Sequence, residues 1–397
     1  MKSGWRTVKF GDVVGLCKEK VDRDNNPFER YVEGGHMGSE DVHIRRWGEF
    51  GEDYVGPAFH RIFRKGQILY GSRRTYLKKV AVAEFDGITA NTTFVLETKD
   101  QSVFMQELLP FLMLTDKFTE HSIKESKGST NPYINWPDIA KFEFPLPPIE
   151  EQKHIAEILW AADEAVEKFG EARVRMDKLL EIECDQLFVG KISSVTIQKL
   201  VDRRVLYPPQ DGNHGNDHPK AKDYVDSGIP FIMASNLSNH NVDIEACKFI
   251  PESVAAKLRI GFSVEGDVLL SHKGTVGEAA IVPALDTPYI MLTPQVTYYR
   301  VKDVGTLNPK YLYYCFLSNT FQVTLKRLSA QSTRAYVGII AQRKFEIPLP
   351  DIKTQNRSVR ILDQMQAEQQ KLARHQTTIG TASSAFANFL YRNRNNV

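Results

Sequence analysis

The stretch KFEFPLPPIEEQ, residues 141–152, has a near copy in KFEIPLPDIKTQ, residues 344–355. The copies lie half a chain apart, which indicates a duplicated domain, because the units of a solenoid recur every 20 to 50 residues or so. The sequence therefore predicts two copies of one domain. Further pairs of similar segments keep the same order and nearly the same spacing: RYVEGGHM (30–37) with PFIMASNL (230–237), KGQILYGSRRT (65–75) with EGDVLLSHKGT (265–275), and GSTNPYI (128–134) with QSTRAYV (331–337).

The composition is that of a globular protein, with 42% hydrophobic and 25% charged residues in a chain long enough for two cores. No apolar run approaches the roughly 18 to 20 residues of a membrane span, and the opening MKSGWRTVKF lacks the apolar core of a secretory signal, so we expect a cytoplasmic protein. The net charge of +2 does not by itself indicate a nucleic-acid partner. The four cysteines show no CxxC pair or regular spacing, which argues against a disulfide framework or a zinc site: Cys17, Cys184, Cys247 and Cys315.

Each copy begins with short β-rich segments that alternate with Gly, Pro, Asn and Asp, and continues with helical stretches before the PLP phrase. We therefore predict an α+β fold with two mixed α/β domains, residues 1–149 and 191–350. The expected strands are GQILYG, KVAVAEF and TTFVLE in the first copy and GDVLLS, AAIVPA and QVTYYRV in the second, and the expected helices include VFMQELLPFLML and PKYLYYCFLSN.

After each PLP phrase the chain becomes free of proline, over residues 150–189 and 353–393. Pro147, Pro148 and Pro350 stand just before these stretches, where proline suits a helix boundary. Each stretch is predicted to be one helix of about 40 residues and therefore about 60 Å long. We place these helices in segments 150–190 and 351–397.

Both helices carry an apolar heptad pattern. One amphipathic helix with such a pattern usually packs on its own domain. Here, however, residues 150–190 hold 5 basic and 11 acidic residues, whereas residues 351–397 hold 7 basic and 3 acidic ones, so the two helices complement each other. The chain order then predicts an antiparallel coiled coil. Its seam is predicted to contain Ile155, Ile158, Ala162, Ala165, Phe169, Ala172, Met176 and Leu179 in the first helix, and Ser358, Ile361, Met365, Glu368, Leu372, His375, Ile379, Ala382, Phe386 and Phe389 in the second.

Two β-rich domains, each ending in the PLP phrase and each followed by a long helix, resemble the specificity (S) subunits of type I restriction-modification systems. The first copy, with HIAEIL after PLPPIEEQ, carries the resemblance most fully. The second copy departs from it at Asp351, Lys353 and Thr354, but keeps Gln355 and the apolar residues Ile361 and Leu362.

The resemblance implies two target recognition domains whose helices pair as an antiparallel coiled coil. It implies a non-catalytic DNA specificity subunit that reads a bipartite double-stranded target, one half-site per domain. The implied partners are two methyltransferase (M) subunits, docked on the helices to modify adenine, and restriction (R) subunits. S-adenosylmethionine would then belong to the methyltransferase, and ATP and Mg to the restriction subunit, with no cofactor on this chain.

Side chains that read DNA are expected on loops, with donors for base edges and cations for phosphates. The aligned candidates lie in the turn after GQILYG and GDVLLS and in the loops within GSTNPYI and QSTRAYV, and HIRRWGEF adds a third basic segment. Ordinary solvated hairpins are the alternative for any one of these residues. The predicted DNA-binding residues are Arg45, Arg46, Ser72, Arg73, Arg74, Thr75, Lys78, Asn131, His272, Lys273, Thr275, Thr333 and Arg334.

The polar stretch PPQDGNHGNDHPK, residues 208–220, holds His214 and His218 with Asp211 and Asp217. These residue types can form a metal site, but no cysteine or apolar residue anchors them, and we interpret the stretch as a polar loop near DNA. No cofactor loop, nucleophile elbow or HExxH motif occurs. Two alternatives to a DNA reader remain: a coiled-coil assembly adaptor without sequence readout, and an enzyme with an unrecognised active site.

Overall fold

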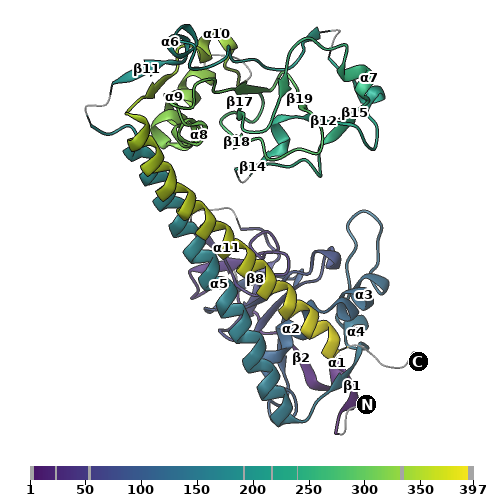
Figure 1. Ribbon diagram of the computed structural model, residues 1–397. Coiled ribbons are helices and arrows are strands. Elements are labelled where there is room, and N and C mark those ends of the chain that lie inside the picture. Colours follow the sequence, from purple (N-terminus) through teal and green to yellow (C-terminus); the bar gives the residue numbers. More distant parts are fainter. Residues whose placement is uncertain are drawn as a thin grey trace. The chain divides into compact units, whose positions relative to one another are not determined.

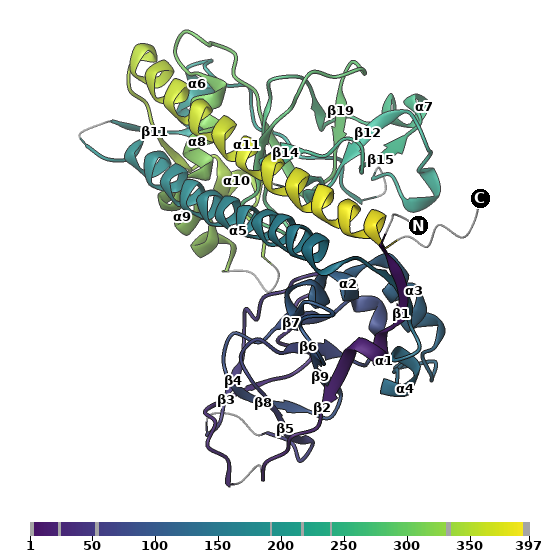
Figure 2. The same ribbon diagram turned by 90° about the horizontal axis from the view of Figure 1, so that it is seen from below.

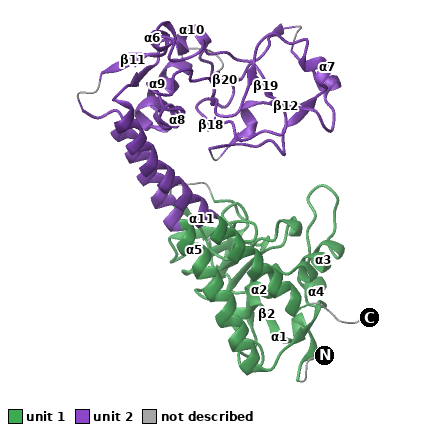
Figure 3. Cartoon of the chain, viewed as in Figure 1, with its two compact units in different colours: residues 1–170, 374–397 green, residues 171–373 purple. Residues whose placement is uncertain are grey.

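The computed structural model describes residues 4–22, 25–51, 55–190, 193–215, 218–238, 240–330 and 335–391. The chain divides into two compact units, which Figure 3 colours separately. Unit 1 combines Met1–Gly170 with Arg374–Val397, and unit 2 is Glu171–Ala373. Each unit therefore contains one β-rich domain together with part of each long helix. None of the described helices combines the length and the apolar run that crossing a lipid bilayer requires.

In unit 1, the β-rich domain contains two four-stranded sheets, ordered β2-β9-β6-β7 and β4-β3-β8-β5, and a β1-β10 pair (Figure 1). Three short α-helices lie between β9 and β10, and β10 leads into the first long helix. The elements are β1 (Arg6–Lys9), α1 (Phe10–Val13), β2 (Val14–Cys17), β3 (Arg30–Val32), β4 (Gly48–Glu49), β5 (Phe59–Phe63), β6 (Ile68–Gly71), η2 (Thr75–Leu77), β7 (Val80–Val82), β8 (Gly87–Ala90), β9 (Thr93–Thr98), η3 (Gln106–Leu108), α2 (Leu109–Leu114), α3 (Asp116–Lys124), α4 (Trp136–Ile139), β10 (Glu143–Leu146) and α5 (Ile149–Gln186).

In unit 2, the sheets are ordered β18-β17-β20 and β15-β12-β19-β16, with a β11-β21 pair and a small β13-β14 hairpin. The elements are β11 (Ser194–Thr196), α6 (Ile197–Asp202), η5 (Ala221–Asp223), β12 (Ile229–Ile232), η6 (Ala234–Asn236), β13 (Leu237–Ser238), β14 (Asn241–Val242), β15 (Lys248–Ile250), α7 (Glu252–Ala255), β16 (Phe262–Ser263), β17 (Val268–Ser271), β18 (Ala279–Ile281), β19 (Ile290–Leu292), β20 (Val296–Tyr299), α8 (Pro309–Leu317), α9 (Asn319–Ser329), α10 (Ile339–Gln342), β21 (Glu346–Pro348) and α11 (Ile352–Leu390).

The duplication is visible in the strand pairing. β6 lies between β7 and β9, both antiparallel to it, just as β17 lies between β18 and β20. β3 runs parallel to β8 with Tyr31 opposite Ile88, and β12 runs parallel to β19 with Phe231 opposite Met291. The predicted α+β fold with two repeated domains and two long helices is confirmed.

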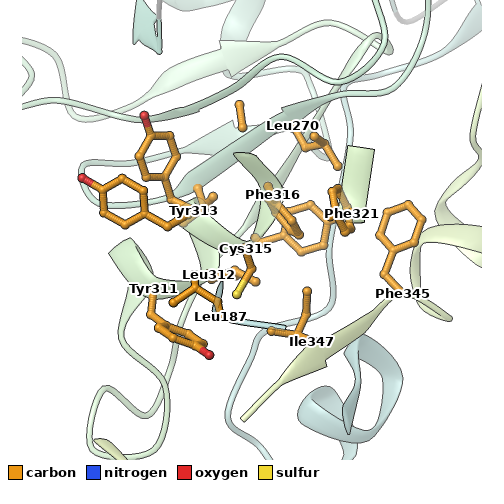
Figure 4. Close-up of a cluster of buried hydrophobic side chains, with 14 of the residues drawn as sticks. Leu187, Leu270, Tyr311, Leu312, Tyr313, Cys315, Phe316, Phe321, Phe345 and Ile347 are labelled. Atoms are coloured by element: carbon orange, nitrogen blue, oxygen red, sulfur yellow. The ribbon is translucent and has the colours of Figure 1, made fainter. Parts of the chain in front are cut away.

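Each β-rich domain buries apolar residues from its sheets, its short helices and both long helices. In unit 1, Phe10 and Tyr70 share a core with Leu159 of α5 and Leu390 of α11. In unit 2, the corresponding core contains Leu180 and Cys184 of α5, Leu187 directly after that helix, and the aromatic residues of α8 and α9; part of it is shown in Figure 4. The end of each long helix is thus part of the hydrophobic core of a domain and does not project freely into solvent.

The long helices run side by side in opposite directions within each unit (Figures 1 and 2). In unit 1, Val166 approaches Gly380, and the ring of Phe169 stacks on His375 with centroids 5.5 Å apart. In unit 2, the Gln369 amide donates a hydrogen bond of 2.5 Å to Asp177. Residue numbers rise along one helix as they fall along the other, as an antiparallel pair requires.

The residues predicted to form the seam are not equally buried. Ile158 is 54% exposed, Leu179 50% and Ile361 44%, whereas the next residues, Leu159, Leu180 and Leu362, are buried. The sequence offers adjacent apolar residues at all three places, and the cores of the domains select the second of each pair. The remaining predicted seam residues include buried Ile155 and partly buried Ala162, Phe169, Met176, Met365, Leu372, Ile379 and Phe386.

Candidate nucleic-acid interface

The two loops predicted to read DNA are joined by backbone hydrogen bonds in unit 1. The amide of Ile134 donates to the carbonyl of Ser72 at 2.9 Å, and that of Arg74 donates to Pro132 at 2.6 Å. Arg73 and Tyr133 form an isolated β-bridge between the two loops. The turn after β6 and the loop that precedes α4 therefore form one continuous surface.

Unit 2 repeats this arrangement. The amide of Val337 donates to the carbonyl of His272 at 3.0 Å, and Lys273 forms an isolated β-bridge with Tyr336. The sequence predicted each loop separately, but the backbone pairing of the two loops emerges only from the tertiary structure.

Each loop pair places a cation against an exposed tyrosine. The guanidinium carbon of Arg73 lies 5.9 Å from the ring centroid of Tyr133, and Nζ of Lys273 lies 6.0 Å from that of Tyr336. The two tyrosines are 39% and 38% exposed. A cation near an aromatic face is attracted to it, so the ring helps to orient the cation toward a ligand. Sequence reasoning missed both tyrosines, although they align in NPYI and RAYV.

Several predicted DNA-binding residues are exposed on these loops. Arg73, Arg74 and Asn131 are exposed in unit 1, as are Lys273 and Thr275 in unit 2. Within the described part of the chain, no carboxylate lies within ion-pair distance of these three cations. Their charges are available to a ligand.

Three other predicted residues, Ser72, Thr75 and His272, have buried side chains that support the loops from inside the domain. Ser72 donates its hydroxyl to the carbonyl of Thr92 at 2.7 Å, and the Thr75 hydroxyl lies 3.3 Å from that of Ser126. His272 is fully buried, with Nδ1 3.0 Å from the carbonyl of Val337. Burial lowers the pKa of His272 to about 4, so the ring is neutral at physiological pH. The burial of Ser72, Thr75 and His272 argues against the prediction that their side chains contact DNA.

Two predicted cations are engaged by carboxylates within unit 1. Lys78 lies 2.9 Å from Glu40 and 3.0 Å from Asp116. Burial lowers the pKa of Lys78, but these hydrogen bonds outweigh it and the pKa is raised overall. Arg45 binds Glu167 of α5 and Asp41, and both hydrogen bonds raise its pKa. Both side chains thus fix loops in place, and neither charge is available to a ligand.

His43 attaches the same segment to α5. Its Nε2 lies 2.8 Å from Asp163, and its Nδ1 lies 3.2 Å from Glu84. The hydrogen bond to Asp163, opposed by burial, raises the pKa of His43 to about 9. His43 and Arg45 therefore contact carboxylates one turn apart on α5, Asp163 and Glu167, and clamp the loop to the helix.

Two predicted residues of unit 2, Thr333 and Arg334, lie outside the described residues, as does Asp217 of the histidine-containing loop. In that loop His214 Nε2 lies 2.9 Å from the buried carboxylate of Asp211, which also approaches His272 at 3.7 Å. Across the described ranges, no group of three or more His, Cys, Asp or Glu side chains is arranged to hold a metal ion.

Comparison with known proteins adds to this geometry. The family described as the type I restriction modification DNA specificity domain matches residues 2–173 and 213–378. The type I restriction enzyme EcoDI specificity subunit of Escherichia coli is 26% identical over 48% of this chain and 43% of its own length. The MjaVIII specificity subunit of Methanocaldococcus jannaschii is 24% identical over 68% of this chain and 65% of its own length. The matched regions thus span less than two thirds of these curated relatives.

Two solved structures share the fold. One, from work on complex assembly and conformational transition of the type I restriction-modification system, has a TM-score of 0.60 at 20% identity, covering 98% of this chain and 97% of the other. The S subunit of a type I system from M. genitalium has a TM-score of 0.60 at 12% identity, covering 98% and 96%. At these identities the likeness establishes the fold.

Proposed function

We infer the function of this chain from its family, because the chain belongs to the type I restriction modification DNA specificity family. We propose that it is the DNA specificity subunit of a type I restriction-modification complex. Each domain reads one half of a bipartite duplex target, and the chain itself performs no catalysis. The observation that carries this proposal is the duplicated loop pair, with Arg73 over Tyr133 and Lys273 near Tyr336.

The chemistry of the exposed loop residues suits duplex DNA. Arginine and lysine donate to guanine edges and to phosphates, and asparagine pairs with adenine in the major groove. Arg73, Arg74 and Asn131 offer these donors in unit 1, and Lys273 and Thr275 offer them in unit 2. The two domains carry different residues at equivalent places, so we expect them to read different half-sites.

The exposed isoleucines of the long helices support a role in assembly. Ile158 and Ile361 occupy equivalent places near the starts of α5 and α11, and both remain exposed although neighbouring apolar residues are buried. We propose that two methyltransferase subunits dock on these helix faces and that restriction subunits join through the complex. S-adenosylmethionine would then bind to the methyltransferase, and ATP and Mg to the restriction subunit, with no cofactor on this chain.

The test is methylation-protection mapping with the complex reconstituted from this chain and its methyltransferase subunits. We expect protection of two short half-sites separated by an unread gap. Exchange of the loop residues in unit 1 is expected to alter one half-site alone. Assembly of the complex without any preferred DNA sequence would instead support the adaptor function and overturn this proposal.

A further inference from the structure

Two cations of unit 1 are held on consecutive carbonyls of one turn. Arg46 donates from Nη2 to the carbonyl of Gly35 at 3.1 Å, and the ammonium of Lys79 donates to the carbonyl of Gly34. The two side chains come from segments 33 residues apart. We call Arg46, Lys79 and the neighbouring Arg74 the turn cluster.

The turn cluster concentrates positive charge. Arg46 and Lys79 donate to adjacent carbonyls, so these two cations lie close together. Burial lowers the pKa of Lys79, and the nearby charges of Arg74 and Arg46 lower it further. Glu33 opposes this effect, but within the described residues none of the three cations has a carboxylate at ion-pair distance. Carbonyl oxygens orient a cation without neutralising it, so the repulsion is relieved when an anion binds.

The turn also lies at the surface, since Gly35 and Arg46 are exposed. A Cβ built on Gly34 would contact nothing within 4 Å, so the backbone of the turn faces free space. Arg46 uses one of its five N–H groups on Gly35, and none of the other described residues accepts a hydrogen bond from its side chain. A DNA backbone can therefore approach the turn and meet several donors at once.

In the described part of unit 2, the positions equivalent to Lys79, Arg74 and Arg46 hold no cation. The amide of Gly71 donates to the carbonyl of Lys79 at 3.0 Å, and the amide of Ser271 donates to Glu278 at 2.8 Å, in the equivalent place before β18. Lys79 therefore corresponds to Glu278, and the charge at this position is opposite in the two domains. Arg74 corresponds to Gly274, since each follows the bridged cation, Arg73 or Lys273.

Unit 2 also has no cation at the position equivalent to Arg46. Met37 bridges Ile44 in unit 1, and Leu237 pairs with Val242 in unit 2, so Arg46 corresponds to Ile244. Ile244 packs against an apolar core. Unit 1 therefore presents four cations at these positions, the turn cluster and Arg73. Unit 2 presents one cation, Lys273, and one anion, Glu278.

We propose that the two domains hold DNA in different ways, with the turn cluster of unit 1 binding backbone phosphates that unit 2 leaves uncontacted. This inference rests on the proposed function as a DNA reader. Unit 1 would supply most of the affinity that is independent of sequence and sensitive to salt. Unit 2 would depend more on base contacts.

Salt dependence measures this directly, because the logarithm of the binding constant falls with the logarithm of salt concentration by about 0.9 for each phosphate contacted. The assembled complex is titrated against a duplex carrying both half-sites. Arg46→Met with Lys79→Met is expected to make the slope shallower by about 1.8. Glu278→Lys is expected to make it steeper. Lys117→Met serves as the control, because Lys117 of unit 1 is paired with Glu120 outside the turn cluster.

Ethylation interference on the same duplex locates the contacts. We expect more interfering phosphates beside one half-site, and their loss in the Arg46 and Lys79 double variant. Thermal unfolding of that variant, expected to match the unmodified complex, excludes misfolding as the cause. An unchanged slope or equal phosphate contacts at both half-sites would overturn this inference and leave the DNA-reading function intact, whereas absence of any preferred DNA sequence would overturn the function itself.

Discussion

Gln152 and Gln355 make the same three hydrogen bonds at the starts of the two long helices. Gln152 accepts from the amide of Met105 at 2.9 Å and donates to the carbonyls of Val103 at 2.8 Å and Pro147 at 2.9 Å. Gln355 repeats these contacts with the equivalent parts of unit 2, namely Asn308 at 2.9 Å, Thr306 at 2.9 Å and Pro350 at 2.8 Å. Both side chains are fully buried. The final glutamine of the repeated phrase thus fastens each helix to the domain before it.

Replacing either glutamine by leucine is expected to destabilise its own unit. Gln152→Leu leaves the backbone amide of Met105 and two carbonyls without the glutamine as partner, which costs about 2 to 5 kcal/mol of unfolding free energy. Chemical denaturation measures the unfolding free energy, and hydrogen exchange shows which unit is destabilised. Gln355→Leu is expected to destabilise unit 2 in the same way. Gln364→Leu, at an exposed position on α11, is the control and should leave both units unchanged. Equal stability of all three variants would contradict the role assigned to this side chain.

The clamp between His43 and α5 is expected to weaken at alkaline pH. The pKa of His43 is raised to about 9 in the folded protein from an ordinary 6.5, so its stabilisation is complete below about 6.5 and disappears as the pH rises through 9. At about 1.4 kcal/mol per pKa unit, the loss amounts to a few kcal/mol at most. The difference in unfolding free energy between the unmodified protein and His43→Gln should therefore shrink between pH 6 and pH 10. A difference that stays constant over this range would show that His43 does not carry charge in the clamp.

Charge reversal at the exposed arginines should weaken DNA binding. Arg73→Glu with Arg74→Glu is expected to lower the affinity of the assembled complex, since each lost base contact is worth about 1 to 3 kcal/mol. Gel-shift titration at physiological salt measures this. Arg45→Glu is the informative control, because Arg45 is paired with Glu167 and its loss should reduce stability and spare intrinsic DNA preference. Unchanged affinity in the double variant would remove Arg73 and Arg74 from the reading surface.

The purified chain is expected to transfer no methyl group and cut no DNA without its partners, because its sequence holds no cofactor loop or recognised catalytic motif. Incubation with labelled S-adenosylmethionine and duplex DNA tests the first activity, and supercoiled plasmid with Mg and ATP tests the second. Turnover that persists through purification to homogeneity would favour the enzyme alternative.

Lengthening both long helices should change the spacing of the half-sites. One heptad inserted after Ala172 and one before His375 preserve the antiparallel register and add about 10 Å to each helix. Since DNA rises about 3.4 Å per base pair, the preferred gap should grow by about three base pairs with both half-sites unaltered. Selection of binding sites from a random pool measures the gap. Altered half-sites at the original separation would show that the helices do not set the spacing.

The sequence by itself determined the duplication, the α+β fold and the two long helices, because these features follow from local patterns. The repeated phrase fixes the period, and proline before a proline-free stretch fixes where each helix begins. The tertiary structure alone decided which of Ile158 and Leu159 is buried, since both are apolar and the domain core selects between them.

The same holds for the site. Arg45 and Arg46 are identical neighbours in sequence, but Arg45 is paired with Glu167, 122 residues away, whereas Arg46 belongs to the turn cluster. The correspondence of Lys79 with Glu278 likewise depends on strand register, because the two turns differ in length. Whether a charged side chain can contact a ligand depends on the residues packed around it, and many of these are distant in the sequence.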